Sequence, residues 1–156
     1  MRIAIVPGSF DPMTLGHVNI VERAAKLFDK VYVAVMINDS KSYMFSAEQR
    51  TTIARLSCGH IENAEIVFDD GMLASLAERL GACAIVKGIR DERDYLYEFE
   101  MAKYNSRHNP NAQTVFLPCE EGAREISSTA VRLKLERGED ISDIVSKKAI
   151  EYILSY

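Results

Sequence analysis

Short apolar runs rich in β-branched residues alternate with segments of helical periodicity along the whole chain. Predicted strands cover residues 2–6, 30–37, 64–69, 83–87 and 113–118. Helical patterns run from residue 15 onward and over 46–58, 72–80, 91–108, 127–137 and 142–155. The second of these opens with Ser46 and Gln49 in the Ser-x-x-Gln form of a capping box. Parallel strands need crossover connections of a dozen or more residues, usually helices, which is the spacing seen here. This alternation predicts a parallel sheet covered by helices.

The expected architecture is α/β: an open, mostly parallel, five-stranded Rossmann-like sheet with helices on both faces. The chain has 156 residues, enough for one core and too few for two ordinary domains. No repeat, linker or low-complexity segment interrupts it. We therefore expect a single domain over residues 1–156, with C-terminal helices from about 127 to 155 packed on the sheet.

Charge and apolar patterning exclude several classes of protein. The net charge is −4 and the longest basic cluster is Lys147-Lys148, which does not suit a nucleic-acid partner. No apolar run approaches the roughly 18 to 20 residues of a membrane span, and the N-terminal strand lacks a signal-peptide pattern. Three separated cysteines, Cys58, Cys83 and Cys119, argue against a disulfide framework or a zinc site and are read as reduced and mostly buried. We expect a cytoplasmic protein.

Polar and basic side chains follow four of the five strands. Ser9, Thr14 and His17 come after the first strand, Lys41 after the second, Lys87 and Arg90 after the fourth, and Arg124 with Ser127 to Thr129 after the fifth. The carboxyl ends of parallel strands meet at one edge of a sheet, where α/β proteins bind ligands. Cations and hydroxyls gathered at one edge of an acidic protein predict a bound polyanion, most simply phosphates.

Each of these residues also has a purely structural interpretation. His17 could cap its helix, Lys41 could be a solvated loop residue, and Ser127 could be an N-cap with no ligand. Gly8 and Gly16 could serve only backbone turns, although glycine also lets a phosphate approach the main chain. The pair Asp69-Asp70 could be a metal or acid/base pair, although the end of a strand before Gly71 is a normal place for solvated carboxylates. His17 beside Gly16 and the Gly8-Ser9 turn favours the functional interpretation.

Four segments, taken in order, resemble the bacterial phosphopantetheine adenylyltransferases. They are GSFDPMTLGH at 8–17, Lys41 before Met44-Phe45, GIR at 88–90 followed by DYLYE at 94–98, and ISSTAVR at 126–132. The first motif belongs to a wider nucleotidyltransferase superfamily, and the Gly-Ile-Arg segment with its trailing Tyr-Glu narrows the resemblance. The similarity runs over nearly the whole chain.

The resemblance implies a reaction. The phosphate of 4′-phosphopantetheine attacks the α-phosphorus of ATP, giving dephospho-coenzyme A and pyrophosphate, without a covalent enzyme intermediate. It also implies Mg²⁺ bound mainly through the ATP phosphates, with no protein metal ligands, and a homohexamer. Such transfer relies on positioning and on stabilising charge on the phosphoryl oxygens.

The resemblance also implies roles for individual residues. His17, Lys41 and Arg90 would be catalytic. Phosphopantetheine would contact Ser9, Lys41, Leu73 and Lys87. ATP would contact Ser9, Phe10, His17, Gly88, Ile89, Arg90, Glu98, Ala123, Arg124, Glu125, Ile126, Ser127, Ser128 and Thr129.

Two positions depart from the family pattern, and two other functions stay open. Lys87 stands where the family usually has Arg, and Ala123-Arg124-Glu125 stands where an aromatic-Ser-Phe loop is usual. Lysine keeps the charge but lacks the planar fork of arginine. The alternatives are an adenylyltransferase for another phosphate acceptor, such as nicotinate mononucleotide, and a non-catalytic nucleotide-binding module.

Overall fold

The computed structural model describes residues 1–156 and contains one five-stranded sheet. Its strands are β1 (Ile3–Gly8), β2 (Lys30–Met36), β3 (Ala64–Asp69), β4 (Ala84–Ile89) and β5 (Gln113–Pro118). The spatial order is β3-β2-β1-β4-β5, and every neighbouring pair is parallel. The α/β prediction is confirmed, with a sheet that is wholly rather than mostly parallel.

Six helices complete the alternation. They are α1 (Leu15–Leu27), α2 (Ala47–Cys58), α3 (Leu73–Arg79), α4 (Glu92–His108), α5 (Ser128–Glu136) and α6 (Lys147–Leu154). The predicted capping box at Ser46 is confirmed: the Ser46 hydroxyl accepts from the Gln49 backbone N–H, and the Gln49 side chain accepts from the Ser46 N–H. Such caps explain why the helix starts could be read from the sequence.

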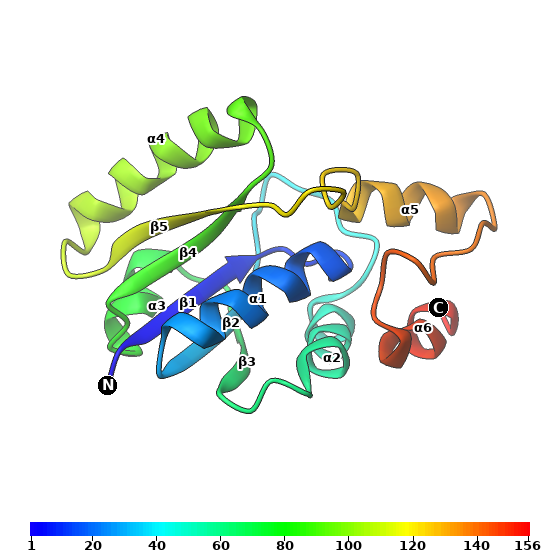
Figure 1. Cartoon of the computed structure of the whole chain (residues 1–156), viewed down its shortest axis with the longest axis horizontal. Helices are drawn as coiled ribbons and strands as arrows, with labels where there is room; N and C mark the ends of the chain where they lie inside the picture. Colours follow the sequence, from blue (N-terminus) through cyan, green and yellow to red (C-terminus); the bar gives the residue numbers. More distant parts are fainter.

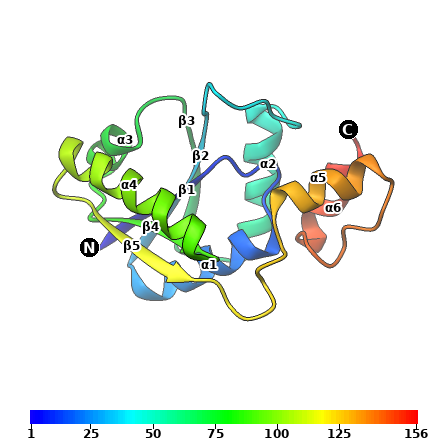
Figure 2. The ribbon, with the colours of Figure 1, turned by 90° about the horizontal axis from the view of Figure 1, so that it is seen from above.

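Helices cover both faces of the sheet because alternate strand residues are apolar on both sides. Val31, Val33 and Val35 of β2 face the larger core, which α1 and α2 cover, whereas Ala34 faces the smaller core beneath α3. Figure 2 shows α3 and α4 on one side of the strands and α1 and α2 on the other. The C-terminal helices extend the α1 and α2 layer, with α6 packed against α2 (Figure 1).

The last helix is shorter than the sequence pattern predicts. It begins at Lys147 and not near residue 142. The Asp140 carboxylate accepts from both the backbone N–H and the hydroxyl of Ser142, so the backbone turns there instead of starting a helix. Ile144 then turns inward, and its carbonyl accepts a 2.9 Å hydrogen bond from the Leu15 N–H at the start of α1.

The cysteines are all free, but they are not all buried. Cys58 is buried, Cys119 is half-buried and Cys83 is exposed, which corrects the expectation that the thiols are mostly interior. Cys83 lies directly before β4, where its backbone carbonyl accepts from the Gln113 N–H and its exposed thiol lies 3.4 Å from the Ile3 carbonyl oxygen. None of the helices has the length and apolar character needed to cross a bilayer.

The central strands β1 and β4 separate after a short paired stretch. Their register holds only Ala4 opposite Ala84 and Ile5 opposite Ile85, whereas each other neighbouring pair aligns six residues. The chain runs outward from β1 through β2 to β3 and then returns to β4 on the other side of β1. A crevice therefore opens at this reversal of strand order, beyond the carboxyl ends of the two strands.

Candidate functional site

A cleft of about 1220 Å³ lies at the carboxyl edge of the sheet. Its walls come from the ends of β1 and β4, the first turn of α1, the loop after β2, and the starts of α3, α4 and α5. Most of the residues that the sequence singled out line it together. They are Ser9, Phe10, His17, Lys41, Leu73, Lys87, Gly88, Arg90, Glu98, Ala123, Ile126, Ser127, Ser128 and Thr129.

The turn after β1 is built around the ring of Phe10. A Cβ on Gly8 would lie 2.9 Å from this ring, so only glycine leaves the space that the ring occupies. Phe10 itself has a φ of 49°, in the left-handed region that L-residues seldom adopt, and its side chain is buried. Its ring meets His17 edge to face, with centroids 5.0 Å apart. Gly8 thus allows Phe10 to support the imidazole.

His17 is oriented by a reciprocal cap with Thr14. The Thr14 N–H donates to His17 Nδ1 at 3.0 Å, and the His17 N–H donates to Thr14 Oγ1 at 3.3 Å. Because Nδ1 is an acceptor, the neutral ring carries its proton on Nε2. Burial, followed by the nearby charges of Arg90 and Lys87, lowers the His17 pKa from 6.5 to about 4. At neutral pH the ring is an uncharged N–H donor.

Two basic residues at the end of β4 are each paired with an acid on α4. Arg90 Nε donates to Asp94 Oδ2 at 2.9 Å, and Lys87 Nζ lies 3.2 Å from Glu98 Oε1. The hydrogen bond from Arg90 holds the pKa of Asp94 below its usual value. Both cations are therefore held in place within the cleft.

The first turn of α5 forms the opposite wall. Ser127 is the N-cap, and its hydroxyl accepts from the Ala130 N–H at 3.1 Å. Ser128 Oγ donates to the Pro12 carbonyl at 2.7 Å, which ties this helix to the turn after β1. The N–H groups of a first helical turn have no partner within the helix and favour anions. The predicted N-cap is confirmed, and phosphate binding by it stays a prediction.

Three predicted ATP contacts do not line the cleft. Ile89 is half-buried in β4, while Arg124 and Glu125 are exposed in the loop before α5. The Arg124 guanidinium lies 3.7 Å from Asp91 Oδ2 instead of among the cations of the cleft. These three assignments came from the resemblance, and the loop is where the chain departs from the family pattern.

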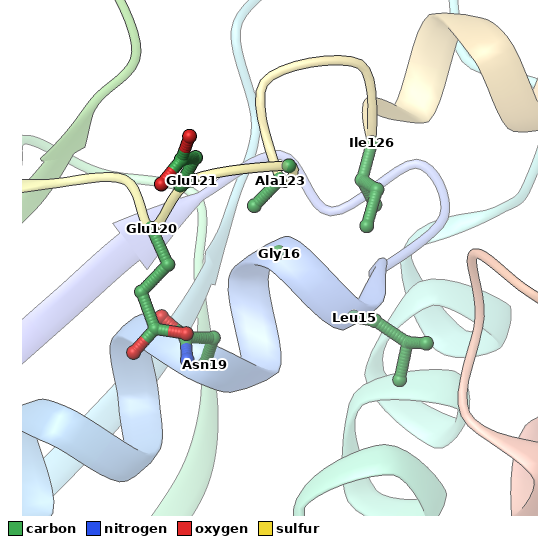
Figure 3. Close-up of a pocket in the computed structure, with 8 residues that line it drawn as sticks. Leu15, Gly16, Asn19, Glu120, Glu121, Ala123 and Ile126 are labelled. Atoms are coloured by element: carbon green, nitrogen blue, oxygen red, sulfur yellow. The ribbon is translucent and has the colours of Figure 1, made fainter.

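A second cavity of about 340 Å³ lies beside the cleft. Figure 3 shows Ala123 and Ile126 above Gly16 of α1, with Glu120 reaching toward Asn19. Gly16, Ala123 and Ile126 line both cavities, so the two spaces adjoin at the start of α1. A Cβ on Gly16 would lie 3.4 Å from the Ile126 carbonyl oxygen, an ordinary contact.

Buried charged residues around the cleft were not identified from the sequence. Asp11 and Arg50 are almost fully buried beneath the loop that carries Lys41, and Arg132 donates to the Asp11 carbonyl at 2.7 Å. Asp11 lies within the first motif, GSFDPMTLGH, where a charged residue between Phe10 and Pro12 could have indicated a role in the site. Nothing in the local pattern distinguishes Arg50 from a surface helix residue.

The arrangement suits a ligand with several phosphates. Neutral His17, the cations Lys87 and Arg90 and the helix start at Ser128 surround one space. The chain contains no group of three His, Cys, Asp or Glu side chains that could hold a metal ion. Donors and fixed cations can stabilise phosphoryl oxygens.

Comparisons with known proteins agree with this geometry. Residues 5–134 match the family described as Cytidylyltransferase-like. A phosphopantetheine adenylyltransferase from Caldanaerobacter subterraneus is 40% identical over 155 residues, covering 97% of each chain. The enzyme of that name from Clostridium beijerinckii is 39% identical over 99% of this chain and 98% of its own, and that from Heliobacterium modesticaldum is 41% identical over 92% and 85%.

The low pKa of His17 predicts a pH effect on stability. The folded pKa of about 4 lies below the ordinary value of 6.5, so the unfolded chain binds the proton more tightly. The free energy of unfolding should therefore have its full His17 contribution above pH 6.5 and lose it as the pH falls toward 4. Urea unfolding of the wild type and of His17→Gln at several pH values should show a shallower dependence in the variant. An NMR titration of the imidazole with a midpoint near 6.5 would contradict the assignment.

Proposed function

The chain belongs to the cytidylyltransferase-like family, among the phosphopantetheine adenylyltransferases, and on this basis we propose that it transfers the adenylyl group of ATP to 4′-phosphopantetheine. The products are dephospho-coenzyme A and pyrophosphate, a step of coenzyme A biosynthesis. The observation that supports this most is the gathering of neutral His17, Lys87, Arg90 and the α5 start around one cleft.

The proposed reaction is a direct displacement at phosphorus. A phosphate oxygen of the acceptor forms a bond to the α-phosphorus as the bond to the bridging oxygen of pyrophosphate breaks, so pyrophosphate leaves with the electron pair. His17 Nε2–H donates to an α-phosphate oxygen, and Arg90 and Lys41 stabilise the negative charge that spreads over the transferring group. The neutral imidazole is suited to donating this hydrogen bond without taking a proton.

Magnesium would bind through the nucleotide in this proposal. The protein has no cluster of acidic side chains that could hold the ion directly. The ion would therefore be held through the triphosphate, and the residues that would hold the triphosphate are above all those of the first turn of α5. The bound ion would neutralise phosphate charge. Ser127 to Thr129 would orient the β- and γ-phosphates with their N–H groups.

A cytoplasmic location and a homohexamer are the finer parts of the proposal. The three free cysteines and the use of ATP favour the cytoplasm. For assembly, Asn105 is the one buried residue of α4, while Leu96 and Tyr97 are 59% and 61% exposed. Apolar groups exposed along one helix are typical of an interface with another chain.

The assembly proposal predicts six copies in solution. Light scattering should give about six times the mass of one chain, and Leu96→Asp should reduce that number because it places a charge on the exposed face of α4. Leu27→Asp is the matched control, since Leu27 is similarly exposed on α1. A monomeric wild type would contradict the assembly but not the reaction.

The reaction itself is tested by mixing the protein with ATP, magnesium and phosphopantetheine and following pyrophosphate. We expect release that requires phosphopantetheine and is not supported by nicotinate mononucleotide. His17→Ala should lower kcat on the order of a hundredfold, because one transition-state donor is lost. Near-normal turnover in that variant would remove His17 from the mechanism, and a wild type that released no pyrophosphate would contradict the function.

Substitution of Lys87 should change KM for phosphopantetheine and KM for ATP to different extents. Lys87→Ala should raise KM for phosphopantetheine about tenfold or more while changing KM for ATP less, because a charged hydrogen bond to the acceptor phosphate is lost and Glu98 loses its partner. Lys87→Arg should retain activity. Lys103→Ala, which removes an exposed lysine of α4, is the control. A larger effect on ATP would place the acceptor phosphate elsewhere in the cleft.

A further inference from the structure

Two buried residues of opposite charge lie beneath the loop that carries Lys41. The loop spans residues 37–45, between β2 and α2, and Lys41 is exposed near its middle without an ion-pair partner. Asp11 is 4% exposed and Arg50 is 1% exposed. Charged groups are rarely buried to this extent unless specific partners hold them, so their partners indicate what they do.

Asp11 holds the far end of the loop through its carboxylate. Oδ2 accepts from the Met44 N–H and Oδ1 from the Phe45 N–H, both at 2.9 Å. Each carboxylate oxygen therefore receives one backbone donor. Hydrogen bonds to an ionised acceptor are stronger than neutral ones, and a pair of them sets both the position and the direction of the chain.

Arg50 holds the near end of the same loop. Its Nη1 donates to the carbonyls of Met36 at 3.0 Å and Ser9 at 2.7 Å, which joins the end of β2 to the turn after β1. The guanidinium also stacks on the Tyr43 ring at 4.0 Å, and Tyr43 Oη accepts from the Asn38 N–H at 2.6 Å. Lys41 thus lies between two segments that buried charges hold.

The backbone of Asp11 is tied to the other side of the cleft. Its carbonyl accepts from Arg132 Nη1 at 2.7 Å, and the next carbonyl, of Pro12, accepts from Ser128 Oγ at 2.7 Å. Both donors belong to α5. One short segment therefore contacts the Lys41 loop through the Asp11 carboxylate and the α5 helix through its carbonyls. The same carboxylate also contacts α5, because Arg132 Nη1 lies 3.9 Å from Asp11 Oδ2.

We propose that Asp11 is a positioning residue that sets Lys41 relative to the nucleotide-binding start of α5, and so acts on catalysis through Lys41. This inference rests on the proposed function. Lys41 has a flexible side chain and no partner of its own, so its reach into the cleft depends on where its backbone is held. A displacement of about 1 Å in a catalytic group can reduce turnover on the order of a hundredfold.

The competing explanation is that Asp11 serves stability alone. In that case its loss would lower activity whether or not Lys41 is present. A residue that acts through Lys41 has nothing to act on once that amine is removed. The interaction between the two substitutions therefore distinguishes positioning from general support of the fold.

Asp11→Asn is the informative variant. The amide is nearly the same size but has one oxygen, so it can accept from only one of the Met44 and Phe45 N–H groups and turns its NH₂ toward the other. We expect kcat to fall about tenfold or more in Asp11→Asn, with KM for ATP changed less. In the Lys41→Ala background the same substitution should change kcat less than twofold.

A similar loss of kcat from Asp11→Asn in both backgrounds would overturn the proposal, as would an unchanged kcat in the single variant. Asp143→Asn is the matched control, because it makes the same chemical change at an exposed carboxylate near the C-terminal helix. If Asp11→Asn does not fold, Tyr43→Ala takes its place in the cycle. Tyr43 is half-buried, and its replacement removes the contact between the loop and Arg50. The effect of this substitution on kcat should likewise disappear in the Lys41→Ala background.

Hydrogen exchange supplies a readout that does not depend on the reaction. In the wild type the Met44 and Phe45 amides should exchange slowly, and in Asp11→Asn at least one should exchange tenfold faster or more, while amides of the sheet such as Val33 stay unchanged. Equal protection in both proteins would overturn the proposal. A wild type that released no pyrophosphate would instead contradict the proposed function, and the exchange result would still decide whether Asp11 holds the loop.

Discussion

The separation of β1 from β4 is the constraint on which the site depends. Strand order reverses at β1, so the crossovers on its two sides lead to different halves of the sheet, and no connection fills the space between the two strand ends. Pairing between the two strands stops after Ile5 and Ile85, and the residues that follow in both strands line one cleft. Gly88 lets α1 pack closely against the end of β4, because a Cβ at this position would lie only 3.0 Å from the Ile20 side chain. The cleft is thus a consequence of topology, and its chemistry comes from the few residues that follow each strand.

Electrostatics within the cleft favour a neutral imidazole beside fixed cations. Burial and the charges of Arg90 and Lys87 both oppose protonation of His17, and the hydrogen bond from Thr14 to Nδ1 leaves the Nε2 proton for a ligand. A charged imidazole would add one more cation, but it would also lose the acceptor that holds it against Thr14. Orientation and charge state are therefore set by the same contacts, and the edge of the Phe10 ring limits the rotation of the imidazole.

Elements with local signals could be predicted from the sequence, and elements set by distant contacts could not. The strands, the Ser46 capping box and the Ser127 N-cap are encoded within a few residues, so the pattern alone indicated them. The start of α6 was missed because the Asp140 side chain bonds to Ser142 and diverts a segment whose periodicity is helical. Arg50 was missed because its partners, Ser9 and Met36, lie 41 and 14 residues away in the chain. Most of the predicted lining residues do share one cleft, whereas Arg124 turned toward Asp91, in the loop where the resemblance was weakest.

The pairing of Lys87 and Arg90 with acids on α4 has two opposing effects on an anionic substrate. Asp94 and Glu98 reduce the net positive charge of the cleft, which weakens the attraction for phosphates at long range. The same pairs hold Arg90 and Lys87 in one direction before any ligand arrives, so less side-chain freedom is lost on binding. For a reaction that depends on where charge develops, prearranged cations stabilise the transition state without reorganising. An acidic protein can therefore bind polyanions and stabilise a transferring adenylyl group with few cations, provided that some of them, such as Arg90, are already directed at the place where the charge will form.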